Sequence, residues 1–162
     1  MSVVDQAVLL AGYLLAHSAA NLSFVEEVKV LTPFSICLRN GQLYTKFHTG
    51  KTQAEAVVNA KEELSVNAAK CDAWAFTREG RMEEEGRTTM SLAVSAWANG
   101  MNEQIVFIQR FSRAPKFRLN GSPTVAIGER LLESSESEPL LTVLRTGISR
   151  HEEGGPQWNS WY

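Results

Sequence analysis

Hydrophobic and polar positions alternate along residues 71–119 and predict a run of antiparallel β-strands. Within residues 89–96 every second side chain is apolar, namely Met90, Leu92, Val94 and Ala96. This two-residue period is that of a strand with one apolar face. Residues 99–102 predict a turn, because Asn and Gly tolerate positive φ angles. The β-branched and aromatic residues 105–108 then indicate a strand that is covered on both faces.

The clearest local signal is Asn40-Gly41, which separates two alternating runs at residues 34–39 and 42–47. This dipeptide is favoured in type I′ turns of β-hairpins. A two-residue turn also predicts the register, in which Arg39 pairs with Gln42 and the pairing continues outward to Phe34 and Phe47. One face of the hairpin is then expected to carry Phe34, Ile36, Leu38, Leu43 and Phe47.

Two segments have helical periodicity. Residues 3–20 carry a wide apolar surface and predict a helix, in which Gly12 permits close contact with a neighbouring element. Thr52 and Glu55 form the pattern of a capping box, which opens a second helix at residues 52–69. Its inward side chains are expected to be Ala54, Val57, Val58, Leu64 and Ala68.

The remaining segments lack long regular patterns. Loops are expected at residues 21–27 and at residues 133–138, where Ser and Glu alternate without apolar side chains. Residues 139–148 form a short apolar element, which is either a helix or a final strand. The tail at residues 154–162 starts with Gly-Gly-Pro and carries the aromatic residues Trp158, Trp161 and Tyr162.

Together these elements predict an α+β protein with a single domain at residues 1–153, followed by the aromatic tail. The expected sheet is a mainly antiparallel meander of five or six strands, with the first two helices packed on one face. A length of 162 residues and a mass of 18.0 kDa suit one domain with one core.

The overall charge argues against nucleic acid as a partner. The formal net charge is -2 and the isoelectric point is about 5.9, so the chain has no general attraction to polyanions. Residues 110–118 do interleave basic and aromatic side chains, as surfaces that bind single strands do. Lys, Arg and Pro also protect edge strands from aggregation, and we favour that interpretation.

The longest apolar run, residues 7–16, is too short to span a membrane. Ten residues rise only about 15 Å in a helix, about half the thickness of the hydrocarbon core. A secretory signal would need a basic region before this run, which the chain lacks, although the small residues 16–20 leave a cleavage site as the alternative. We therefore expect a cytoplasmic protein with no membrane partner.

Cysteine and histidine spacing predicts neither a disulfide nor a metal site. Cys37 and Cys71 are far apart and outside any framework, so both are expected to be reduced and buried. His17, His48 and His151 lie in no metal-ligand spacing, so no metal and no cofactor are expected. His17 is assigned to a helix C-terminus, where it would interact with the helix dipole.

Gln109 and Arg110 interrupt a strand that should be buried, and buried polar groups need partners. We expect both to line a ligand pocket together with Arg78 and Ser95, because clefts often open between helices and sheets. In the alternative interpretation, Gln109 hydrogen-bonds to the backbone at the strand end and the Arg110 side chain extends to water.

Since no catalytic pattern is present, the leading hypothesis is a protein that associates with a partner or with itself. A homodimer is expected, with an interface formed by Trp158, Trp161 and Tyr162, because aromatic residues are enriched at interfaces. The alternative for the tail is that it folds back over its own sheet. The alternative function is small-molecule binding, or a small enzyme, with a pocket between helix and sheet.

Overall fold

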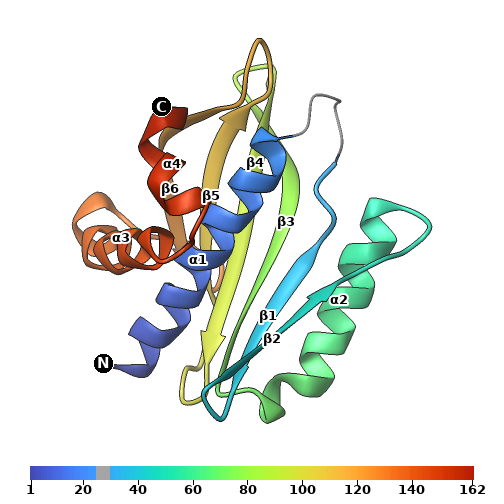
Figure 1. The fold of residues 1–162 in the computed structure, drawn as a ribbon, viewed down its shortest axis with the longest axis vertical. Coiled ribbons are helices and arrows are strands. Elements are labelled where there is room, and N and C mark those ends of the chain that lie inside the picture. The colour runs from blue at the N-terminus through green and yellow to red at the C-terminus, as the bar shows by residue number, and fades with distance from the viewer. Residues whose placement is uncertain (25–29) are drawn as a thin grey trace.

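An antiparallel sheet with helices on both faces forms the structure, a computed structural model that describes residues 1–24 and 30–162 (Figure 1). Its strands are β1 (Phe34–Arg39), β2 (Gln42–Phe47), β3 (Ala73–Glu84), β4 (Arg87–Ala98), β5 (Ile105–Ser112), β6 (Arg118–Ile127) and β7 (Arg130–Leu131). They lie in the order β2-β1-β3-β4-β5-β6-β7. The predicted α+β class and antiparallel sheet are confirmed, but the described part has seven strands rather than five or six.

The helices are α1 (Val3–Ser23), α2 (Gln53–Asn67), α3 (Ser134–Ser149) and α4 (Gly154–Gln157), with the short 3₁₀ helices η1 (Ala68–Lys70) and η2 (Trp158–Trp161). A capping box between Ser2 and Asp5 begins α1. The helix continues past its predicted end, to Ser23. Residues 25–27 of the predicted exit loop lie outside the described residues.

By length and composition α1 is apolar enough to cross a membrane. In this structure most of the helix is buried, between the sheet and α3. The same apolar residues therefore serve as the central part of the core.

Two glycines allow α1 and α3 to cross at very short distance. A Cβ atom at Gly12 would lie 2.2 Å from the carbonyl oxygen of Leu144. A Cβ atom at Gly147 would lie 2.3 Å from the carbonyl oxygen of Leu9. The close contact predicted at Gly12 is thus confirmed, and its partner is α3.

The first two helices lie on opposite faces of the sheet, so the prediction that they share one face is wrong (Figure 1). Alternate residues of β3 explain the difference, because Ala73 and Ala75 join the core under α1 while Trp74 and Phe76 join a second cluster under α2. A strand that is apolar on both sides requires a cover on both sides.

The predicted inward face of α2 is confirmed only in part. The buried residues of this helix are Ala56 and Ala60, whereas Ala54 and Val58 are exposed. Val57, Leu64 and Ala68 are partly buried and pack against the cluster under α2. The predicted start of the helix is right, since the Thr52 hydroxyl accepts a hydrogen bond from the Glu55 amide.

The hairpin at Asn40-Gly41 is confirmed in both turn and register. Asn40 and Gly41 have φ angles of 50° and 76°, and Arg39 pairs with Gln42. Leu43 and Phe47 share the predicted face with Leu38 and Phe34, but β2 is the edge of the sheet and all of its residues are exposed, so these two side chains lie outside the core. Helix α3 lies on the β6 side of the sheet, away from β2, and leaves the β2 edge open (Figure 1).

Residues 110–118 do not form the predicted edge strand. They include the end of β5 and the loop that leads into β6, and β5 is an interior strand. Strand β6 pairs antiparallel with β5 and covers the side of β5 that the basic residues 110–118 were expected to protect as an open edge.

The predicted loop at residues 133–138 is instead the start of α3. Ser and Glu are tolerated in a first turn, and the helix is stabilised by burial of Leu141, Leu144 and Ile148. Of the two alternatives for residues 139–148, the helix is correct.

The C-terminal residues fold back onto the domain rather than forming a separate tail. Trp158 and Trp161 are each only 8% exposed and belong to the core under α1, while Tyr162 is half exposed. Gly154 lies against α1, where a Cβ atom would be 2.4 Å from the carbonyl oxygen of Ala16. In this conformation the two indoles are covered by the chain itself and are not available to a partner.

Candidate functional site

The sheet face that carries α2 holds three of the four predicted ligand-site residues. Ser95 pairs with Phe76 and therefore shares its face, as does Arg78 two residues further along β3. Arg110 lies on the same face, because it pairs with Ser91. Gln109 points to the opposite face, which α1 covers.

Gln109 is fully buried and binds the backbone. Its side-chain nitrogen donates to the carbonyl oxygens of Arg110 and Gly121, each at 3.0 Å. Its carbonyl oxygen accepts a 3.4 Å hydrogen bond from the Tyr162 hydroxyl. These contacts lie at an irregularity in the pairing of β5 with β6. Gln109 therefore hydrogen-bonds to the backbone, as the alternative interpretation of this residue predicted.

Arg110 is held by the hairpin tip instead of a ligand pocket. Its guanidinium nitrogens lie 2.5 and 3.2 Å from the Glu84 carboxylate and 3.2 Å from the Thr124 hydroxyl. The hydrogen bond from Arg110 lowers the pKa of Glu84, and the same bond raises the pKa of Arg110. Arg78 lines a separate hollow of about 1100 Å³, so the predicted residues do not form a single pocket.

Ser95, the remaining predicted residue, lines a cavity between α2 and the sheet. We call it the α2 cavity; its volume is about 520 Å³, and it is lined by Lys61, Leu64, Ser65, Ala68, Trp74, Phe76, Ser95, Trp97, Asn102 and Gln104. The indoles of Trp74 and Trp97 stack with ring centroids 6.4 Å apart. An aromatic wall with a few polar groups is typical of small-molecule sites.

Trp74 carries an unusual donor. Its ring nitrogen Nε1 is buried and has no hydrogen-bond partner among the described residues. A buried donor without an acceptor costs about 1–3 kcal/mol, so almost all such groups are paired in folded proteins. Sequence reasoning missed this residue, because nothing in the chain distinguishes a Trp with a partner from one without.

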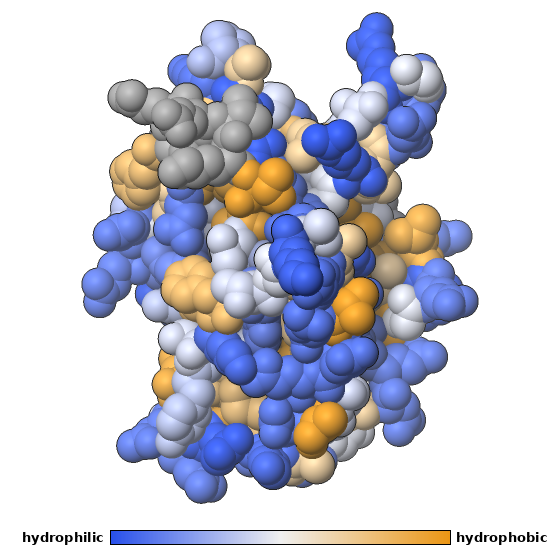
Figure 2. Space-filling view, turned by 90° about the vertical axis from the view of Figure 1, so that its right-hand side faces the viewer, coloured by the Kyte–Doolittle hydropathy of each residue, from blue (hydrophilic) through white to orange (hydrophobic). Residues whose placement is uncertain are grey.

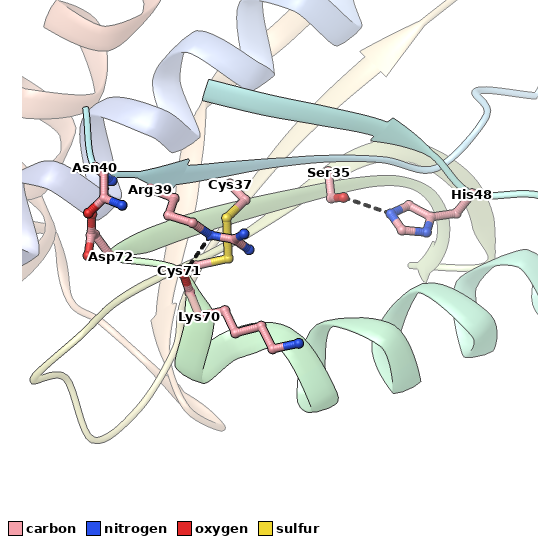
Figure 3. Close-up of a disulfide and its surroundings, with 8 residues drawn as sticks. All are labelled: Ser35, Cys37, Arg39, Asn40, His48, Lys70, Cys71 and Asp72. Carbon is pink, nitrogen blue, oxygen red and sulfur yellow. Dashed lines mark hydrogen bonds between the residues drawn. A yellow bond between two sulfur atoms is a disulfide. The ribbon is translucent and has the colours of Figure 1, made fainter. Parts of the chain in front are cut away.

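A second cluster, which we call the Ser35 cluster, joins Ser35 and His48 (Figure 3) to Glu63 on α2. The Ser35 hydroxyl oxygen on β1 is 2.7 Å from Nε2 of His48, which follows β2. Nδ1 of the same imidazole is 3.6 Å from the Glu63 carboxylate on α2. The backbone fixes the position of His48, whose amide donates to the Pro33 carbonyl at 2.8 Å.

Burial, more than the neighbouring charges, keeps the His48 imidazole neutral at pH 7. Burial lowers the pKa of His48, the Glu63 carboxylate opposes that shift, and the Lys46 ammonium adds to it. Lys46 also forms an ion pair with Glu63. A neutral imidazole with its proton on Nδ1, facing Glu63, leaves Nε2 free to accept the proton of the Ser35 hydroxyl.

A disulfide joins Cys37 and Cys71 beside this cluster, so the prediction of two reduced thiols is wrong (Figure 3). Their Cα atoms are 5.8 Å apart although 34 positions separate them in sequence. The hairpin, α2 and η1 return the chain to β1, and the next strand pairs Cys37 with Trp74. Spacing in sequence could not reveal a contact that this path creates.

The two remaining histidines form a pair on the opposite side of the sheet. Nδ1 of His17 is 3.1 Å from Nε2 of His151, whose other nitrogen accepts from the Gly154 amide at 2.8 Å. His17 lies well inside α1 and not at a helix end as predicted. Burial lowers the pKa of both imidazoles. Within residues 1–24 and 30–162 there is no group of three or more side chains suited to bind a metal ion.

Comparison of the chain with protein families, curated proteins and solved structures gives no match. Function is therefore inferred from the geometry of the α2 cavity and of the Ser35 cluster.

Proposed function

We propose that this protein binds a small, mainly apolar molecule that presents a hydrogen-bond acceptor, and that the α2 cavity is its site. The observation that supports this most is Trp74, which lines the cavity and whose buried Nε1 is a donor without a partner among the described residues. An acceptor on the ligand would satisfy this donor and remove the cost of leaving it unpaired.

The other walls agree with such a ligand. A volume of about 520 Å³ falls within the usual range of ligand sites. Phe76 and Trp97 offer apolar contact, while Ser95 and Lys61 add polar groups that suit an oxygen-rich end of the molecule. Hydrophilic side chains predominate on this side of the protein, where hydrophobic ones form separate patches (Figure 2). That surface favours a bound small molecule over a broad apolar interface.

The proposal predicts that 8-anilinonaphthalene-1-sulfonate, an aromatic probe with acceptor oxygens, binds at one saturable site. Trp74→Phe keeps the ring shape but removes the donor, so we expect at least tenfold weaker binding, a loss of about 1.4 kcal/mol. Trp158→Phe, which removes an indole from the other core, should bind normally. Fluorescence titration measures the affinity, and near-ultraviolet circular dichroism shows that each variant remains natively packed.

Equal affinity of Trp74→Phe and the parent protein would contradict the assignment of the cavity. Fluorescence that rises without saturation would show general adsorption of the probe and would equally contradict it.

Self-association is the second candidate function. The exposed edge strand β2 is a better candidate for the interface than the C-terminal aromatic residues. Leu43, Tyr44 and Phe47 are each at least 50% exposed on this strand. An open apolar edge is a ready site for pairing with another strand, and two-fold pairing of identical edges gives a homodimer. We propose this homodimer in place of the one expected through Trp158 and Trp161.

A homodimer through β2 predicts a light-scattering mass near twice the 18.0 kDa of the chain. In a hairpin with a two-residue turn, the amide of Thr45 points away from β1. Thr45→Pro removes this donor and should give a monomer, whereas Thr45→Val keeps it and should remain dimeric. A monomeric parent protein would end this proposal.

The disulfide also suggests where in or outside the cell the protein acts, whichever of the two candidate functions it has. Disulfides persist mainly in oxidising compartments, so the bond between Cys37 and Cys71 favours such a location over the cytoplasm expected from the sequence.

A further inference from the structure

The Ser35 cluster has the connectivity of a nucleophile, a base and a carboxylate. Ser35, His48 and Glu63 come from three elements, and they meet at distances of 2.7 Å from hydroxyl to imidazole and 3.6 Å from imidazole to carboxylate. The two contacts use the two different nitrogens of the ring. This order of groups recurs on unrelated folds that activate a serine for attack on a carbonyl carbon.

The burial of His48 and the tautomer of its ring both favour transfer of a proton from the Ser35 hydroxyl to the imidazole. The His48 side chain is only 2% exposed, and its Nδ1 lies 3.6 Å from the Glu63 carboxylate, whose negative charge favours the ring proton on that nitrogen. Nε2 is then a base directed at the Ser35 hydroxyl. Because burial lowers its pKa, His48 is already unprotonated at neutral pH and ready to accept a proton.

We propose that Ser35 is the nucleophile of a second site, which hydrolyses small carboxylic esters. The Ser35 oxygen bonds to the ester carbonyl carbon while its proton moves to His48. The bond to the alcohol oxygen then breaks, and His48 returns the proton to the departing alcohol. Water attacks the acyl group, gives one proton to His48 and releases the carboxylic acid, and the Ser35 oxygen regains a proton. Glu63 stays ionised throughout.

The space beside Ser35 sets the size of the acyl group. A hollow of about 240 Å³ adjoins the cluster, walled by the disulfide and by Tyr44, Thr45 and Asn67. Such a volume suits a short acyl chain rather than a fatty acid. Lys46 lies directly opposite Ser35 in the strand pairing and also lines the hollow, and its ion pair with Glu63 holds the ammonium beside the cluster, where a positive charge favours an oxyanion.

This site is separate from the α2 cavity. The two share only Leu64 among their lining residues, and each can be tested without the other. Loss of probe binding at Trp74 would leave the Ser35 proposal standing, and the reverse also holds.

The decisive experiment is labelling of the full-length, oxidised protein with a small alkyl fluorophosphonate, followed by peptide mass spectrometry. We expect one phosphonylated residue, Ser35. Ser35→Ala should abolish the label, and His48→Gln should slow labelling at least 100-fold. Ser91→Ala, which removes another buried serine hydroxyl from the same sheet, should label at the parent rate. Hydrolysis of p-nitrophenyl acetate should follow the same order.

Two further outcomes decide between catalysis and a purely structural hydrogen bond. If the parent protein takes no label, or is labelled at another residue, Ser35 is not a nucleophile and the contact with His48 serves only to hold the hairpin. Peptide mapping of the parent protein settles this even where a variant fails to fold. Glu63→Gln should slow labelling less than His48→Gln and shift its pH profile, whereas a structural role predicts no shift.

Discussion

Gly147→Ala is expected to destabilise the protein by about 4 kcal/mol, a large part of the total stability of a small domain. The added Cβ atom would lie 2.3 Å from the carbonyl oxygen of Leu9, so backbone and not a mobile side chain obstructs it. The helices α1 and α3 can relieve the clash only by moving apart, which would expose the contact around Gly12 as well.

Urea unfolding monitored by circular dichroism measures this loss. Thr146→Ala, an exposed neighbour on the same helix, serves as the control and should stay within about 0.5 kcal/mol of the parent. An intrinsic gain of about 1 kcal/mol in helix propensity accompanies the change at Gly147. If that gain appeared as higher stability, the tight crossing of α1 and α3 would be wrong.

Removal of the disulfide is expected to lower the free energy of unfolding by about 2–4 kcal/mol. The bond closes a long loop, since 34 positions separate Cys37 from Cys71, and it ties β1 to the start of β3 behind α2. Without the bond the unfolded chain gains conformational freedom and the wall of the Ser35 hollow loosens.

The measurement compares urea unfolding of the parent with and without dithiothreitol. The double variant Cys37→Ala, Cys71→Ala is the control, because its midpoint should be low and insensitive to the reductant. Alkylation before reduction should add no groups to the parent protein. Two alkyl groups under native, unreduced conditions would show free thiols and contradict the bond.

Local signals predicted a large part of the fold. The hairpin at Asn40-Gly41 follows from two residues that accept positive φ angles, and its register follows from the length of the turn. The long strands on either side of Gly86 follow from alternation over neighbouring residues. Each of these features depends on contacts close in sequence or on backbone preference, and such contacts are visible in the chain itself.

The predicted ligand site failed for a different reason. Alternation correctly places Arg78, Ser95 and Arg110 on one sheet face. Ser95 lines a cavity because α2 crosses the sheet face there. Arg110 does not line that cavity, because its guanidinium pairs with the Glu84 carboxylate. A single residue of irregular pairing near Gln109 also directs that side chain into the backbone of β6.

By itself, the sequence determined the α+β class, the antiparallel strands, the hairpin and the close contact at Gly12, because these depend on dihedral preference, periodicity and side-chain size. Only the tertiary structure decided which face α2 covers, that Cys37 meets Cys71, and that the C-terminal indoles fold inward. It also decided that Ser35, His48 and Glu63 converge. These arrangements join residues far apart in the chain, and their positions are set by the packing of whole elements, which no local pattern encodes.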